Sequence, residues 1–406
     1  MPLPGRASVA VSILVSVGSR YETAADSGIS HFVEHMVFKG GGRYPTARDV
    51  SEAIEGVGGV LNAATDREST VFWTRVPAAS LSLAVSVLSD MVFNPALDPN
   101  EVTKERQVVI EELRMYEDNP QEYAQIVFDD VMWPDHPLGR DVGGCEETVR
   151  GFTAEQCRDH LARYMRPSNV VVSIAGAVEP AEAQRLFTEE MLEWAARSRP
   201  VAGVPAPAAS PSGPALRIAR RSVEQASILV GARSGSYLDP DRYAGDMLNA
   251  ILGEGMSSRL FLELRERRGV VYDVHSFSSR LRDSGATVIG LGCEPRRAVT
   301  AVRAAIAELR KLADEPVGDA ELRKAREYVK GRLLLSLEST AALGEYAGHQ
   351  LLLTGEILEP PEIVAHIESV TAEDVQRAAQ ALLDSGLRGA AVGPFRSSAR
   401  LEALLT

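Results

Sequence analysis

Apolar residues alternate with small or polar ones near the start of the chain. Over residues 7–17 every second position is apolar, at Val9, Val11, Ile13, Val15 and Val17. This period of two predicts a half-buried strand, and it does not fit the helical apolar run of a signal peptide. The pattern also predicts a hairpin within residues 59–74 and closing strands at 170–175 and 389–392.

A proline-rich segment divides the chain into two halves of similar length. Residues 199–215 contain five prolines, so they form neither a helix nor a central strand. We therefore expect an N-terminal domain over residues 1–198, a linker over 199–215 and a C-terminal domain over 216–406.

Two short sequences recur at nearly the same offset in the two halves. Residues 12–15 match 227–230, and residues 153–155 match 371–373, which indicates an internal duplication. Helices and strands are mixed in each half without regular alternation. The predicted fold class is therefore α+β, with two homologous domains, each a mostly antiparallel sheet flanked by helices.

Composition and charge exclude several classes of function. The 406 residues include 56 Asp and Glu against 43 Lys and Arg, which gives a net charge of −13. Such a chain is a poor partner for nucleic acid or an anionic membrane, and it favours basic or neutral peptides. We find no transmembrane segment, signal peptide or transit peptide. Cys145, Cys157 and Cys293 are too few and too far apart for a disulfide framework, which indicates a reducing, cytoplasmic location.

The candidate chemistry lies in a helix predicted over residues 30–40. His31 and His35 are four residues apart, so they share a face of this helix, and Glu34 stands beside them. The other positions are apolar, so the helix should be buried, and buried imidazoles need polar partners. Zinc is such a partner, and H-x-x-E-H is the inverted form of the H-E-x-x-H zinc motif. The alternative is a pair of satisfied core histidines.

A second predicted helix, over residues 98–119, offers the third ligand that a zinc site requires. Glu105 and Glu112 are two turns apart on a face that otherwise carries valines. Carboxylates within an apolar stripe need a cation, so Glu112 is the predicted ligand. Glu105 would orient a ligand or the water. Glu111, on a more polar face, is the rival ligand, and a plain surface helix is the alternative.

These motifs resemble the pitrilysin/insulinase family of zinc metallopeptidases, which includes insulin-degrading enzyme and the mitochondrial processing peptidase. The likeness covers most of the chain, with matching segments at residues 31–35, 105–112, 115–120, 136–139, 255–260 and 264–272. The resemblance implies one zinc ion per chain, bound by His31, His35 and Glu112. It also implies Glu34 as the general base, with Glu105 behind the site.

The resemblance implies further catalytic and substrate-binding residues. Arg265 and Tyr272 match a pair that contacts the substrate and the tetrahedral intermediate, although their local sequence alone reads as structural. Asn62 and Ala63 lie in a strand that matches a substrate-binding sheet edge, where an ordinary core hairpin is the alternative. Family members enclose the site between clam-like halves. The short members pair, so we expect a homodimer or a heterodimer with a related subunit.

The sequence therefore predicts a zinc-dependent endopeptidase that hydrolyses unfolded or short polypeptides with metal-activated water and a Glu base. One alternative is a non-catalytic, peptide-binding partner subunit of a heterodimeric processing peptidase. Another is a structural subunit like those of respiratory complexes. Both kinds depart from the zinc motif, whereas this chain retains Glu34. Family members usually have more residues before the first strand, so we expect that either the start of this sequence is misassigned or the first sheet lacks an edge strand.

Overall fold

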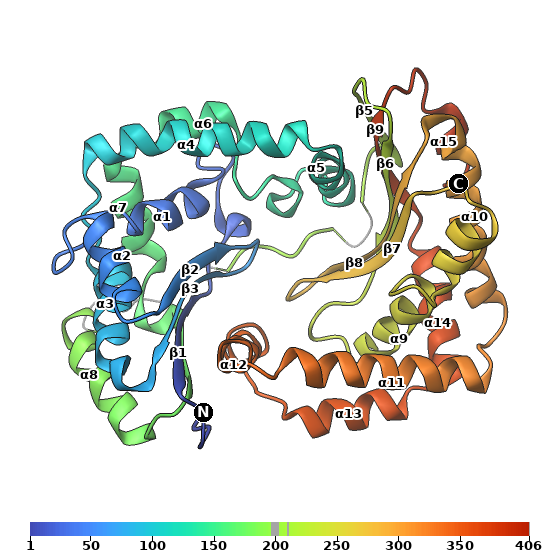
Figure 1. Cartoon of the computed structure of the whole chain (residues 1–406). Coiled ribbons are helices and arrows are strands. Elements are labelled where there is room, and N and C mark those ends of the chain that lie inside the picture. The colour runs from blue at the N-terminus through green and yellow to red at the C-terminus, as the bar shows by residue number, and fades with distance from the viewer. Residues whose placement is uncertain (196–202, 209–210, 406) are drawn as a thin grey trace. The chain divides into compact units, whose positions relative to one another are not determined.

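The computed structural model describes residues 1–195, 203–208 and 211–405. Its strands form two sheets with helices packed on them (Figure 1). The strands are β1 Ser8–Val15, β2 Val60–Thr65, β3 Thr70–Pro77, β4 Val170–Gly176, β5 Leu216–Arg220, β6 Ala226–Arg233, β7 Asp273–Arg280, β8 Gly285–Cys293 and β9 Arg388–Gly393.

Helices make up most of the remaining described structure. They are α1 Ile29–Val37, α2 Ala47–Glu55, α3 Leu81–Phe93, α4 Pro99–Asp118, α5 Pro120–Met132, α6 Glu146–Gly151, α7 Ala154–Tyr164, α8 Pro180–Ala195, α9 Arg242–Leu252, α10 Ala298–Asp314, α11 Asp319–Ser336, α12 Thr340–Thr354, α13 Pro360–Ser369, α14 Ala372–Asp384 and α15 Ala399–Glu402. A π-helical segment, η5, covers Phe261–Arg267. Among the described residues, no helix has both the length and the apolar character needed to cross a membrane.

The two sheets share one strand order. The first runs β2-β3-β1-β4 and is antiparallel throughout, whereas the second runs β7-β8-β6-β9-β5, with β5 parallel to β9. The repeated residues 12–15 and 227–230 lie in β1 and β6, which hold equivalent places. The predicted α+β class, with two related and mostly antiparallel domains, is confirmed. Where the second sheet has β5 beside β9, the described residues of the first sheet form an isolated bridge between Pro2 and Gly176 of β4.

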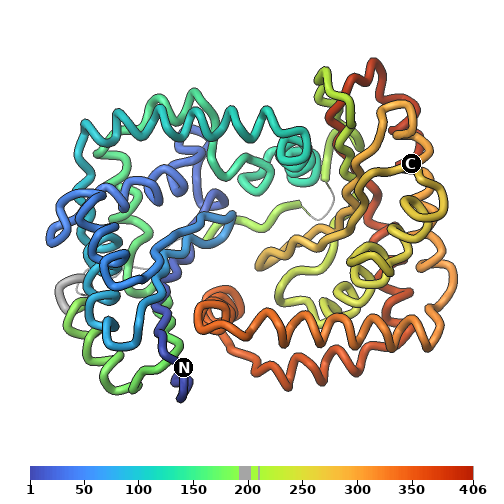
Figure 2. The backbone as a smooth tube through the Cα atoms, viewed as in Figure 1, coloured from blue at the N-terminus to red at the C-terminus, as the bar shows by residue number. Residues whose placement is uncertain are grey.

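Contacts divide the chain into two units that differ from its two sequence halves. Unit 1 comprises Met1–Leu113, Arg140–Pro205 and Ser336–Ile357, and unit 2 comprises Arg114–Gly139, Ala206–Leu335 and Leu358–Thr406. Each unit takes one helix from the other half, because α12 packs on β1 and β4 while α5 packs on β6 and β9. In Figure 2 the orange tube of α12 accordingly lies beside the blue strand β1.

The predicted linker is only partly described. Residues 199–202 and 209–210 lie outside the described residues, whereas 203–208 and 211–215 form neither helix nor strand. Strand β5 begins directly after this segment, at Leu216.

Strand β1 is buried on both faces, not on one as its alternation predicts. Val11 and Ile13 face the core that α1 and α3 share. The opposite face is covered by α12, where a Cβ on Gly348 would lie only 2.6 Å from Leu14 Cδ1. Glycine therefore permits the close approach of this helix. Because α12 comes from the other half of the chain, the local pattern of β1 cannot reveal it.

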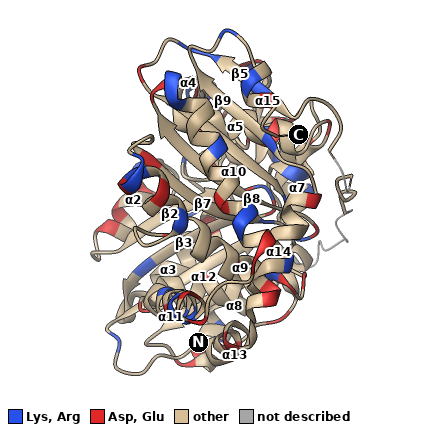
Figure 3. Ribbon diagram, turned by 90° about the vertical axis from the view of Figure 1, so that its right-hand side faces the viewer, with Lys and Arg blue, Asp and Glu red and all other residues tan. Residues whose placement is uncertain are grey.

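Helix α2 shows how a surface helix is held on the core. Val50 and Ile54 are buried, while Arg48 and Glu52 form an exposed ion pair of 2.6 Å. Figure 3 shows both signs of charge on α2. Because an exposed ion pair adds little stability, the buried apolar face is what anchors the helix.

Candidate metal centre

Helix α1 is held at its first turn by a buried carboxylate. Glu22 accepts hydrogen bonds from the backbone N–H groups of Gly28 (2.7 Å) and Ser30 (2.8 Å). A helix leaves these donors unpaired, and a negative charge suits its N-terminus. Gly28 has a φ of +91°, and a Cβ there would lie 2.3 Å from the carbonyl oxygen of Gly143. Glycine is therefore required where α1 meets this loop.

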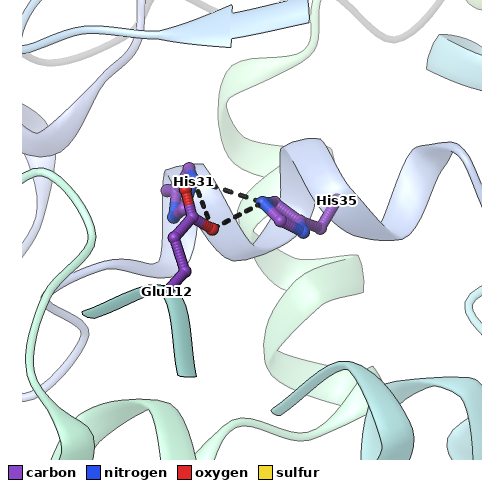
Figure 4. Close-up of side chains that lie close together, drawn as sticks. All are labelled: His31, His35 and Glu112. Atoms are coloured by element: carbon purple, nitrogen blue, oxygen red, sulfur yellow. Dashed lines mark hydrogen bonds and ion pairs between the residues drawn. The ribbon is translucent and has the colours of Figure 1, made fainter. Parts of the chain in front are cut away.

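His31 and His35 of α1 face Glu112 of α4. The two Nε2 atoms are 3.2 Å apart, and Glu112 Oε2 lies 3.4 Å from Nε2 of His35 and 3.8 Å from Nε2 of His31. Figure 4 shows the three side chains converging from the two helices. The rival residue Glu111 is exposed instead, and it accepts a hydrogen bond of 2.7 Å from Gln107 Nε2.

The three candidate ligand atoms form a triangle that would fit a tetrahedral metal ion. Metal–ligand bonds of about 2.0 to 2.2 Å at tetrahedral angles place ligand atoms about 3.3 to 3.6 Å apart. The observed edges are 3.2, 3.4 and 3.8 Å. Two imidazoles and one carboxylate also form a donor set of catalytic zinc sites. In the part of the chain that the structure describes, this is the one group of three such side chains placed to hold a metal.

The surroundings perturb the two imidazoles in opposite directions. Burial, assisted by the charge of His35, lowers the pKa of His31 to about 4. Burial also acts to lower the pKa of His35, but hydrogen bonds to Glu105 and Glu112 outweigh it and raise that pKa to about 9. The carboxylates of Glu105 and Glu112 thus favour a positive charge at His35, whereas burial disfavours one at His31.

Glu105 lies behind His35 and contacts its other ring nitrogen. Its Oε1 lies 2.9 Å from His35 Nδ1, and its Oε2 lies 2.5 Å from Lys39 Nζ. Burial acts to raise the pKa of Glu105, but the bonds to His35 and Lys39 outweigh it and lower that pKa. A histidine that donates Nδ1–H to a carboxylate presents its Nε2 lone pair on the other side, which is how metal-binding histidines are oriented.

Glu34 stands beside the three ligand residues without joining them. Its Oε2 accepts a hydrogen bond of 2.5 Å from the hydroxyl of Thr65, the last residue of β2. Burial raises the pKa of Glu34, while His35 lowers it and Glu112 raises it through their charges. A carboxyl group with a raised pKa beside metal ligands is suited to accepting and returning a proton.

Two family models match the chain one after the other. Residues 3–145 match Insulinase (Peptidase family M16), and residues 151–329 match the Peptidase M16 inactive domain. The chain is 34% identical to an uncharacterized zinc protease of Streptomyces coelicolor, over 97% of this chain and 86% of that protein. It is 32% identical to the uncharacterized zinc protease YmxG of Bacillus subtilis, over 95% of this chain and 93% of that protein. The chain belongs to peptidase family M16.

Solved structures share the fold of this M16 chain. A protease from Helicobacter pylori matches with a TM-score of 0.89 at 23% identity, over 97% of this chain and 96% of that chain. A peptidase M16 inactive domain from Pseudomonas fluorescens matches with a TM-score of 0.90 at 18% identity, over 98% and 95%. The family models and the relatives above 30% identity confirm the insulinase-type resemblance that the motifs indicated.

Asn62 and Ala63, predicted to bind substrate, lie in β2 at the edge of the first sheet. Among the strands that the structure describes, β2 has β3 as its single neighbour. Asn62 is exposed and Ala63 is half-buried, as the alternation of this strand requires. An edge strand presents backbone N–H and C=O groups that can pair with another chain. The edge position is compatible with substrate binding at Asn62 and Ala63, which stays a prediction.

Two further residues predicted to act on substrate, Arg265 and Tyr272, belong to unit 2. Arg265 lies in η5, and Tyr272 directly precedes β7 and is 70% exposed. The Cζ atom of Arg265 lies 5.9 Å from the ring centroid of Tyr272. The two side chains are therefore brought together within unit 2. Single π-helical turns are rare and occur often at functional sites.

The structure adds three residues that the sequence did not single out: Glu22, Lys39 and Thr65. Lys39 follows His35 by four residues, so helical periodicity alone could have placed it on the same face. Glu22 and Thr65 reach α1 from other elements, and no local pattern connects them to it.

Proposed function

We propose that this M16 chain is a zinc-dependent endopeptidase acting on unfolded or short polypeptides. The observation that carries the proposal is the position of Glu34, fixed by Thr65 beside the His31, His35 and Glu112 ligand atoms. A purely structural metal site has no use for a carboxyl group held in this way. The relatives named zinc proteases support the same conclusion.

The ligand residues define where the metal would bind. His31 Nε2, His35 Nε2 and Glu112 Oε2 would hold one zinc ion per chain, and His35 is oriented by Glu105. Zinc bound there supplies a water of lowered pKa and an electrophile for the substrate carbonyl. A set of three protein ligands is typical of catalytic rather than structural zinc sites.

Glu34 moves the proton in this mechanism. Its Oε2 is engaged by Thr65, so we assign proton transfer to Oε1. Glu34 accepts the proton of the attacking water and then passes it to the leaving amine. Burial raises the pKa of its carboxyl group, which brings it closer to the pH at which such a group works as both base and acid.

The substrate would bind as an extended peptide. Pairing with the free edge of β2 at Asn62 and Ala63 uses backbone hydrogen bonds, so it accepts many sequences. Arg265 and Tyr272 would stabilise the oxyanion, either from the same chain or from a second subunit in a homodimer or a related heterodimer. The net charge of −13 favours basic peptides. The three free cysteines suit a reducing compartment such as the cytoplasm.

Digestion of a mixed peptide pool, followed by mass spectrometry, tests this function. We expect the wild type to cut peptides and Glu34→Gln to be inactive while both hold stoichiometric zinc. Glu111→Gln, an exposed carboxyl on α4, is the matched control and should remain active. If zinc-loaded wild type cuts nothing, the proposal is wrong, and a non-catalytic partner subunit becomes the better interpretation.

A further inference from the structure

Lys39 is connected to the metal centre through one buried carboxylate. Its Nζ lies 2.5 Å from Glu105 Oε2, and Glu105 Oε1 lies 2.9 Å from His35 Nδ1. The Glu105 side chain is 5% exposed, so few waters can replace a lost partner. Glu105 Oε2 thus contacts the ammonium group of Lys39, and Glu105 Oε1 contacts the imidazole of His35.

The backbone fixes Lys39 in this position. Helix α1 ends at Val37, and the N–H of Lys39 still bonds the carbonyl of Met36 at 3.1 Å. The chain then turns at Gly40, whose φ is +119° and where a Cβ would lie 2.4 Å from the carbonyl oxygen of Pro45. Lys39 is thus held one helical turn beyond His35, on the side that faces Glu105 of α4.

We propose that Lys39 is a positioning residue of the metal centre and acts through Glu105. By holding Oε2, it fixes the rotation of the carboxylate so that Oε1 receives the Nδ1–H of His35. This fixes the tautomer and the ring plane of His35, so that the Nε2 lone pair points at the other ligand atoms. The inference rests on the proposed zinc site and extends it by one residue that does not itself touch the metal.

A merely structural ion pair would behave differently. If Lys39 only joined α1 to α4 through this ion pair, its loss would lower stability and leave the zinc affinity of the folded protein unchanged. If Lys39 acts through Glu105, the loss of Lys39 should weaken zinc binding only while the Glu105 carboxylate is present to accept the hydrogen bond from His35 Nδ1. A double-mutant cycle on metal affinity distinguishes the two roles.

The test measures zinc dissociation constants of the apo protein against a competing chelator. We expect Lys39→Met to weaken zinc binding about 10-fold or more, because outer partners of metal ligands typically contribute 10- to 100-fold. Lys39→Arg, which keeps the charge, should restore most of the affinity. In a Glu105→Gln background, Lys39→Met should add no further loss. The visible spectrum of the cobalt-substituted protein should change in Lys39→Met, because the ring of His35 is no longer fixed.

Lys104→Met is the matched control. Lys104 also forms an ion pair of 2.6 Å on α4, with Glu101, but its side chain is 69% exposed. It should leave zinc affinity and the cobalt spectrum unchanged. Unaltered affinity in Lys39→Met, or an equal loss in the Glu105→Gln background, overturns the inference while the proposed function stands. A wild type that binds no zinc overturns both.

Discussion

The hydroxyl of Thr65 donates a hydrogen bond of 2.5 Å to the carboxylate of Glu34. This bond joins the end of β2 to the helix that carries His31 and His35, the two proposed histidine ligands. The strand proposed to bind the peptide and the residue proposed to move the proton are thereby fixed relative to each other. A peptide added to β2 would be aligned with Glu34 by the register of the strand, which is the kind of positioning that catalysis requires.

Thr65→Val removes this hydrogen bond and keeps the shape of the side chain. We expect kcat to fall about 10-fold or more with unchanged zinc content, because a hydrogen bond to a charged group contributes about 1.5 to 3 kcal/mol. Steady-state kinetics on a peptide identified in the digestion experiment, together with metal analysis, checks this. The pKa of Glu34 should also rise, because the Thr65 bond acts to lower it.

Thr74→Val is the control within the same hairpin. Thr74 is buried in β3 and donates a hydrogen bond of 2.8 Å to the carbonyl oxygen of Val60. Its loss should lower thermal stability but leave kcat unchanged. Equal losses of kcat in the two variants would show that hairpin integrity, rather than the bond to Glu34, is what matters.

The variants Glu112→Gln and Glu111→Gln distinguish the proposed third ligand, Glu112, from its rival, Glu111. We expect Glu112→Gln to lose stoichiometric zinc after dialysis against a chelator, because it removes the carboxylate that faces both Nε2 atoms. Glu111→Gln should keep its zinc and its activity. Atomic emission spectroscopy of the dialysed proteins gives the metal content. Loss of zinc from Glu111→Gln alone would place the third ligand one residue earlier.

Local sequence patterns predicted the two helices that carry the proposed ligands. They did not predict the features that depend on contacts between distant segments. The helix expected over 98–119 is observed as Pro99–Asp118, and the spacing of His31 and His35 alone predicted their shared face. The bond from Thr65 to Glu34 and the packing of α5 and α12 join segments far apart in sequence. Periodicity describes which face of an element is buried, but it does not identify the element that buries it.

A substitution of Phe128 tests whether α5, from the first half of the sequence, stabilises the sheet of the second half. Phe128 lies in α5, is fully buried, and packs with Leu229 of β6 and Val288 of β8. Phe128→Ala should lower the free energy of unfolding by about 3 to 5 kcal/mol, as expected for an aromatic core residue. Amide hydrogen exchange should become faster in β6, β8 and β9 first. These strands all follow the proline-rich segment, whereas residue 128 precedes it.

Phe72→Ala is the companion variant for the first sheet. Phe72 is fully buried in β3, in the core of unit 1. It should accelerate exchange in β1 and β3 before any effect on β6 or β9. If Phe128→Ala instead opened the amides of the first sheet, α5 would stabilise its own sequence half, and the division into units 1 and 2 would be wrong.

The buried imidazole of His160 should make the free energy of unfolding fall as the pH is lowered. His160 lies in α7, is 7% exposed, and its Nε2 is 3.5 Å from Ser30 Oγ. Burial, assisted by Arg163, lowers its pKa to about 4, against about 6.5 in an unfolded chain. The unfolded state therefore takes up a proton first, and the free energy of unfolding should fall by about 3 kcal/mol between pH 6.5 and pH 4. Urea unfolding at pH 7.5 and pH 4.5 measures this fall. His160→Gln should reduce it by most of that amount, because the other titrating groups cancel in the comparison, and an identical fall in both proteins would contradict the assignment.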